Sequence, residues 1–136
     1  MNDCDRGRIR NRKYAKQLRD FSGLRFGKIT PTDIDAFLDF QDNTFIFIET
    51  KYGDAKLSTG QRLALERVCD ACADSGRNSM VIVASHDTHD DIDVAGLPVV
   101  RIRLHKKWRE PSKKRTVLKT IRDYRSWINK NKRTSN

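Results

Sequence analysis

Near the middle of the chain lies the run Thr44-Phe45-Ile46-Phe47-Ile48, followed directly by Glu49-Thr50-Lys51. β-branched and aromatic residues are typical of strands, and a run this apolar is expected near the centre of a sheet and not at its edge. Side chains two residues apart project from the same face of a strand. Glu49 and Lys51 are therefore expected on one face, while the two isoleucines project from the other and are free to be buried.

Just upstream, apolar and acidic or aromatic residues alternate over residues 33–40, with Ile34, Ala36, Leu38 and Phe40 on one parity. This period of two predicts a second strand. The polar segment 41–43 separates the two strands, and the pattern as a whole predicts an antiparallel hairpin. Such a hairpin can set Asp35 beside Glu49.

Further elements are expected on both sides of the hairpin. Ser58 or Thr59 can cap a helix that reaches about Ser75 and ends at Gly76. Residues 80–84 form a buried strand pattern and residues 98–104 an alternating one. A C-terminal helix is marked by Val117, Ile121, Tyr124 and Ile128. At the other end of the chain, a helix over 11–21 is indicated by Tyr14, Leu18 and Phe21 at i, i+4 and i+7.

This order of elements predicts an α/β protein with a central mixed β-sheet flanked by helices. With 136 residues the chain is expected to form a single domain. We expect a basic disordered arm over residues 1–10, the domain over 11–130 and a basic tail over 131–136. The N-terminus lacks the apolar stretch of a secretory signal, and no run approaches the roughly 18 apolar residues of a membrane span. The protein is therefore expected in the cytoplasm, which would be the host's if it is phage-encoded, with no membrane partner.

The formal net charge of +10 is distributed in three blocks. Residues 1–28 carry nine Lys/Arg against three Asp/Glu, and residues 101–136 carry fourteen against two. Residues 29–100 reverse this balance, with five basic and thirteen acidic residues. Basic flanks around an acidic centre suit a protein that grips a polyanion and presents carboxylates between its contacts.

The three cysteines are an odd number, which argues against a disulfide-stapled secreted domain. Cys69 and Cys72 form a C-x-x-C pair, but no second pair follows that would complete a zinc or iron–sulfur set. Since both fall on the helix expected after Ser58, buried core thiols are favoured over metal ligands.

Two convergent carboxylates, Asp35 and Glu49, suit a hard divalent cation, Mg²⁺ or Mn²⁺. Such a cation can polarise a phosphoryl oxygen and lower the pKa of a bound water. Lys51 could orient that water or stabilise the charge that develops in the transition state. These groups are sufficient for hydrolysis of a phosphodiester.

Asp35, Glu49 fourteen positions later and then Lys51 together resemble the signature of the PD-(D/E)xK nuclease superfamily. The resemblance covers roughly residues 11–104 and implies a restriction-endonuclease-like core. It implies that Asp35 and Glu49 bind the metal, that Thr50 offers its backbone carbonyl, and that Lys51 assists catalysis. Many members place a Gln at the start of the following helix, where Gln61 stands. Small members include junction resolvases and phage-type recombination nucleases, so branched DNA is an expected substrate by analogy only.

The sequence departs from the motif at its first position, because Pro31 is followed by Thr32 and not by Asp. Asp33 and Asp35 share parity, so either could face the site. Asp35 is favoured because the residues after it continue directly into the strand, which leaves Asp33 as the less favoured metal ligand.

DNA is the expected partner, with RNA left open, and cleavage of both strands by one site per chain would favour a homodimer. Expected nucleic-acid contacts come from both basic blocks: Arg8, Arg10, Arg12, Lys13, Lys16, Arg19, His105, Lys106, Lys107, Lys113, Lys114 and Arg115. Trp108 is expected to stack on a base or to pack against the C-terminal helix. For His86 a solvated loop position is favoured over a role in the site. The alternative to a nuclease is a non-catalytic nucleic-acid-binding module with the same fold.

Overall fold

A computed structural model describes residues 17–134, with side chains as far as residue 132. The described chain divides into two units, with the boundary between Thr32 and Asp33.

The N-terminal unit has little regular structure over residues 17–32. It contains a short 3₁₀ helix, Ser22–Leu24, and an isolated bridge between Phe26 and Ile29. The helix predicted for 11–21 is wrong over its described part, since residues 17–21 are not helical and Leu18 is 80% exposed. One local reason is Asp20, whose carboxylate accepts hydrogen bonds from the backbone N–H and the hydroxyl of Ser22. This kind of turn competes with helix formation.

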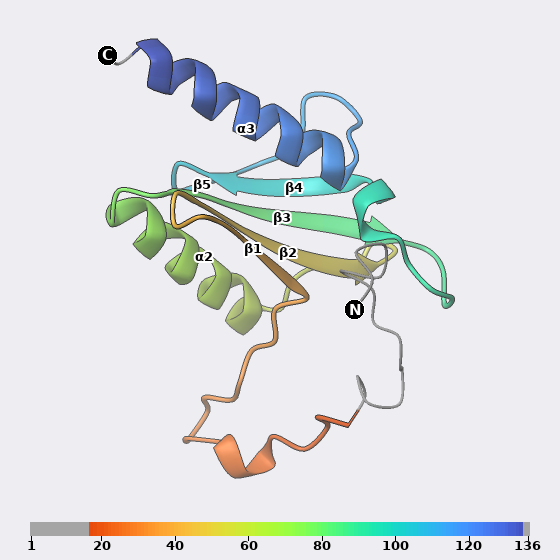
Figure 1. Cartoon of the computed structure of the whole chain (residues 1–136). Coiled ribbons are helices and arrows are strands. Elements are labelled where there is room, and N and C mark those ends of the chain that lie inside the picture. Colours follow the sequence, from red (N-terminus) through yellow and green to blue (C-terminus); the bar gives the residue numbers. More distant parts are fainter. Residues whose placement is uncertain (1–16, 135–136) are drawn as a thin grey trace, which may run out of the picture. The chain divides into compact units, whose positions relative to one another are not determined.

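The second unit is built on a five-stranded sheet with the strand order β1-β2-β3-β4-β5 (Figure 1). The strands are β1 (Ala36–Phe40), β2 (Thr44–Tyr52), β3 (Asn78–His86), β4 (Val99–Leu104) and β5 (Lys107–Arg109). β2 and β3 are parallel, and the other neighbouring pairs are antiparallel. The predicted mixed sheet, the hairpin and the central position of residues 44–48 are confirmed.

Two helices cover opposite faces of this sheet, α2 (Thr59–Asp74) and α3 (Val117–Thr134) (Figure 1). A short 3₁₀ helix, Val94–Gly96, precedes β4. The α/β class predicted from the sequence is confirmed. In the part of the chain that the structure describes, no helix combines the length and the apolar character needed to cross a membrane.

The apolar side chains of β2 divide between two cores. Ile46 and Ile48 pack toward α3, in a cluster that includes Ile121 and Tyr124. Phe47 packs toward α2, in a cluster with Leu65, Cys69, Val81 and Val83. Because β2 is buried on both faces, a polar side chain on it has to find a partner inside the protein.

Two tight turns use left-handed backbone at residues other than glycine. In the β1–β2 turn Gln41 and Asp42 have φ values of 55° and 63°, and in the β4–β5 turn His105 and Lys106 have φ values of 53° and 64°. Consecutive residues with positive φ are characteristic of type I′ turns, whose twist matches that of paired strands. The second turn creates β5, which the sequence analysis missed.

Candidate active site

The carboxylate of Glu49 lies near the carboxyl end of β2, on the face covered by α2. The parallel neighbours β2 and β3 both end here, where open α/β sheets usually place their ligands. Glu49 is paired with Val83 across the sheet and follows Phe47 on the same face. Only 3% of the residue is exposed, and its neighbours Phe47 and Val83 belong to the apolar core under α2.

Gln61 reaches Glu49 from the first turn of α2. Ser58 is the N-cap, and its Oγ accepts a hydrogen bond of 3.2 Å from the backbone N–H of Gln61, which confirms the predicted helix start. The Gln61 side chain donates through Nε2 to Glu49 Oε1 at 2.8 Å. In a capping box the residue at this position turns back to its own N-cap. Here the Gln61 side chain points to Glu49 on β2 instead, so its hydrogen bond links the start of α2 to the sheet.

Lys51 lies on the same face of β2 as Glu49, as the spacing predicted. Its Nζ is 3.9 Å from Glu49 Oε1, and 24% of its side chain is exposed. The ammonium group therefore lies between the buried carboxylate of Glu49 and solvent, and it can contact both.

Asp35, directly before β1, is held by Thr50. Its Oδ2 accepts a hydrogen bond of 2.8 Å from the Thr50 backbone N–H and one of 2.9 Å from the Thr50 hydroxyl. The structure thus brings Asp35 to the Glu49-Thr50-Lys51 segment, as the hairpin predicted. The expected role of Thr50 concerns its carbonyl oxygen, and that role stays a prediction. Asp33 is near enough for its charge to act on Glu49.

The pKa of Glu49 is raised from 4.5 to about 7. Burial is the largest cause, because it penalises the ionised form, and the charge of Asp35 raises the pKa further. Lys51 acts in the opposite direction, and Asp33 adds a smaller repulsion. The backbone N–H of Asp35 is near enough to the carboxylate to lower its pKa by a small amount. Among the described residues, Glu49 Oε2 is buried without a hydrogen-bond partner. Buried carboxylate oxygens are normally satisfied, so this atom is available to a further hydrogen-bond donor or to a cation.

A divalent cation fits this donor set. The carboxylates of Asp35 and Glu49 are hard oxygen donors, and Glu49 Oε2 is left over for a ligand. Within residues 17–134 there is no group of three or more His, Cys, Asp or Glu side chains that could hold a metal. A site here would therefore combine two carboxylates with backbone and water oxygens, an arrangement that suits Mg²⁺.

Cys69 and Cys72 lie on α2, after its first turn, and Cys4 lies outside the described residues. Cys69 is buried, and its sulfur accepts a hydrogen bond of 3.1 Å from the Ser79 hydroxyl. Burial raises the pKa of the Cys69 thiol, which disfavours the thiolate that would bind a metal. Cys69 is a core thiol, as the sequence analysis favoured, and Cys72 is half-buried at the margin of the same core.

Three rings that the sequence analysis did not bring together lie at the ends of β2 and β3. Tyr52, next to Lys51, is the register partner of His86 and meets it edge to face at 5.6 Å between ring centroids. His89 stacks on Tyr52 at 5.0 Å. His86 Nδ1 also lies 3.0 Å from the Thr88 carbonyl oxygen. His86 is thus packed at the strand end and is not the solvated loop residue that was favoured.

The basic residues expected to contact nucleic acid differ in their surroundings. Lys106 is ion-paired with Asp74, and Arg115 pairs with Asp123 at 3.0 Å. His105 meets the ring of Trp127. Three lysines are exposed and form no ion pair among the described residues: Lys107, Lys113 and Lys114. Arg19 is exposed in the N-terminal unit, and Arg8, Arg10, Arg12, Lys13 and Lys16 lie outside the described residues.

Trp108 packs on the α2 side of the sheet, so the expectation that it packs against the C-terminal helix is wrong. Its indole Nε1 donates to Glu66 Oε1 at 2.7 Å, and the guanidinium of Arg101 lies over its ring. This placement follows from β5: Trp108 pairs with Arg103 of β4 in the sheet, so its side chain lies on the face that α2 covers.

No family model matches this chain, and neither does a curated protein or a solved structure.

Proposed function

We propose that this chain is a metal-dependent DNA endonuclease that hydrolyses phosphodiester bonds at the Asp35–Glu49–Lys51 site. The observation that carries the proposal is Glu49 itself. One oxygen of its buried carboxylate accepts a hydrogen bond from Gln61, and the other has no partner among the described residues. Burial, and then the repulsion of Asp35 and Asp33, raise its pKa. A protein gains no stability from such a group, so a ligand-binding role explains it best.

Each residue of the site has a role consistent with its contacts. Asp35 and Glu49 would hold Mg²⁺ or Mn²⁺, with the Thr50 carbonyl as a further ligand. The bound cation would supply Lewis-acid activation of the scissile phosphate and of a water. Gln61 orients Glu49 through the 2.8 Å hydrogen bond, and Thr50 orients Asp35. Lys51, partly exposed beside Glu49, would stabilise the charge that develops on the phosphoryl oxygens.

A polyanionic substrate is supported by the charge of the chain. The net charge is +10, and Lys107, Lys113 and Lys114 are exposed without an ion pair within the described residues. The resemblance to PD-(D/E)xK nucleases, with the Asp–Glu–x–Lys spacing and a strand–strand–helix–strand order, favours DNA as the substrate. A preference for branched DNA and action as a homodimer are extensions of that resemblance.

The test is cleavage of linear duplex, nicked, single-stranded and four-way-junction DNA with Mg²⁺, with Mn²⁺ or with chelator. We expect metal-dependent products that Lys51→Ala reduces by about a hundredfold or more, while DNA binding survives. Lys56→Ala is the matched control, because Lys56 is an exposed lysine five residues later, and it should retain activity.

Full activity of the purified Lys51→Ala protein would contradict the proposal. Salt-sensitive DNA binding without turnover in either metal would instead identify a non-catalytic nucleic-acid-binding module. Metal-dependent products that Glu49→Ala abolishes would rule out that alternative.

A further inference from the structure

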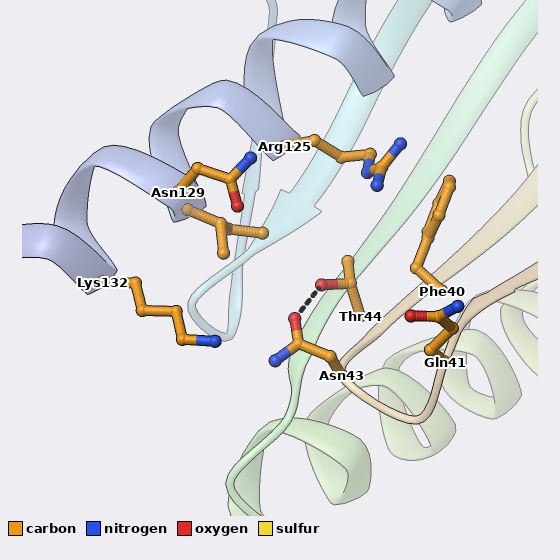
Figure 2. A pocket seen from close by; sticks show the side chains of 8 residues that line it. Phe40, Gln41, Asn43, Thr44, Arg125, Asn129 and Lys132 are labelled. Carbon is orange, nitrogen blue, oxygen red and sulfur yellow. Dashed lines mark hydrogen bonds between the residues drawn. The ribbon is translucent and has the colours of Figure 1, made fainter.

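A pocket of about 240 Å³ lies between the β1–β2 turn and the second half of α3 (Figure 2). One face of the helix lines it, since Arg125, Ile128, Asn129 and Lys132 follow one another at helical spacing. The strand ends and the turn supply the opposite wall: Phe40, Gln41, Asn43 and Thr44. The pocket begins where β2 begins, and Glu49 is five residues further along β2, about 17 Å away along a strand. It is therefore separate from the candidate active site.

Arg125 dominates the chemistry of this pocket. Its guanidinium lies 4.2 Å from the centroid of the Phe40 ring, and Figure 2 shows it reaching from α3 toward that ring. Stacking fixes the plane of the guanidinium and leaves the N–H donors at its edge available. Within residues 17–134 these donors have no carboxylate and no hydrogen-bond acceptor. Two other arginines of this unit differ in this respect, because Arg77 is paired with Asp42 and Arg115 with Asp123.

The rest of the lining favours an anion. It contains no Asp or Glu, and its two charged side chains, Arg125 and Lys132, are both basic. The side-chain oxygen of Asn43 already accepts hydrogen bonds from the Thr44 hydroxyl at 2.7 Å and from the Asn78 amide at 3.3 Å. Its NH₂ group is therefore the end left to donate. Gln41 and Asn129 bring further amides to the wall.

We propose that this pocket binds a phosphate group, with Arg125 as its principal ligand. A planar guanidinium with two free N–H groups matches the oxygens of a phosphate, and such charge-assisted hydrogen bonds are strong. The volume is below the roughly 300 Å³ at which drug-sized pockets begin, so it suits one phosphate with part of its attached nucleoside. The phosphate can belong to a free mononucleotide or to a polynucleotide backbone. The proposal does not depend on the nuclease activity.

The test is a titration of the full chain at constant ionic strength, followed by the NMR signals of the arginine Nε–H groups. The probes are inorganic phosphate, a deoxynucleoside monophosphate and a short single-stranded oligodeoxynucleotide. The Arg125 signal is expected to shift saturably. Arg125→Ala should weaken binding about tenfold or more, the effect of losing a charge-assisted contact. Arg125→Lys keeps the positive charge but loses the paired N–H donors of the planar guanidinium, so it should weaken binding less than Arg125→Ala does.

Arg122→Ala is the matched control, because Arg122 is an exposed arginine on α3 outside the pocket. It removes the same charge and should change affinity by less than about twofold.

Arg125-dependent binding of the mononucleotide identifies a free phosphate ligand, and Arg125-dependent binding of the oligonucleotide alone identifies the backbone. An Arg125 signal that no probe shifts overturns the proposal. It is equally overturned if Arg122→Ala weakens binding as much as Arg125→Ala does. If Arg125→Ala fails to fold, the shift of the Arg125 signal in the unmodified chain and the affinity of Arg125→Lys still test the proposal.

Discussion

The ionisation of Glu49 links stability to pH in a direction unusual for a carboxylate. Its pKa is raised from 4.5 to about 7, so between these values the folded chain binds a proton that the unfolded chain has released. The stabilising contribution is fully present below about pH 4.5 and is lost as the pH rises through about 7. Above about pH 7 the folded protein carries a buried charge that the contacts of Glu49 only partly offset.

Glu49→Gln should therefore stabilise the protein in a pH-dependent way. With chelator present we expect little change in the free energy of unfolding near pH 5. Near pH 8, where the substitution removes an ionised buried group, we expect a gain of up to about 3 kcal/mol. Thermal unfolding at the two pH values measures this. An equal change in Tm at both would contradict the raised pKa.

Glu66→Gln is the control for that experiment, because the pKa of Glu66 is shifted in the opposite direction to that of Glu49. The pKa of Glu66 is lowered, chiefly by the hydrogen bond from Trp108, because that bond favours the ionised form. Neutralising Glu66 should lower Tm at both pH values, since its stabilising contribution is present above the pKa of the unfolded chain.

At the scale of elements, the sequence predicted best where local signals and tertiary packing agree. Ser58 caps α2, and the chain leaves the helix through Gly76, whose φ is +90°. The strands at 44–48 and 80–84 were found because the sheet buries them and their sequences are therefore continuously apolar. The strand at 98–104 was found from its alternation, and it is only partly buried, since Val99 is 6% and Val100 42% exposed. Glu49 and Lys51 could be placed on one face because parity within a strand is a property of the backbone.

The elements that could not be predicted depend on contacts distant in sequence or on turns. A stripe of three apolar residues suggested a helix over 11–21, but Leu18 and Phe21 are exposed, so burial does not support it. β5 is only three residues long and depends on the left-handed residues His105 and Lys106. Neither residue is a glycine that would reveal such a turn. The stacking of Arg125 on Phe40 joins residues 85 positions apart and has no local signal.

Gly60, in the first turn of α2, and Gly76, just beyond its C-terminal end, provide a test of how the helix begins and ends. Neither Gly60 nor Gly76 has an atom within 4 Å of an added Cβ, so packing does not distinguish them. Gly76 has a φ of +90°, and Gly60 lies in the helix, outside the left-handed region. Gly76→Ala should lower the free energy of unfolding by about 1 kcal/mol, and Gly60→Ala should raise it by about 0.5–1 kcal/mol. Denaturant unfolding measures both, and a shift of the same sign would refute this account of the helix end.

At the scale of the whole molecule, the charge blocks of the sequence are partly neutralised by folding. Three acids of α2 at a spacing of four, Glu66, Asp70 and Asp74, face β4 and β5. They pair there with Arg103 and Lys106 from the C-terminal basic block. The acidic centre is therefore smaller than the composition indicates, and the carboxylates of Asp33, Asp35 and Glu49 stand out more clearly within it.

This neutralisation makes Lys106 and Lys107 differ, although both were expected from the sequence to contact nucleic acid. Lys106 is paired with Asp74, so its site has a local charge near zero, whereas Lys107 is exposed without an ion pair among residues 17–134. If DNA contacts this edge of the sheet, Lys107→Ala should lower the slope of log K against log[salt] by about 0.9, the value for one phosphate contact. Lys106→Ala should leave the slope nearly unchanged. Fluorescence anisotropy with labelled duplex over a series of salt concentrations measures both slopes. Equal slopes for the two variants would mean that the ion pair with Asp74 does not persist when DNA binds, or that this edge does not contact DNA.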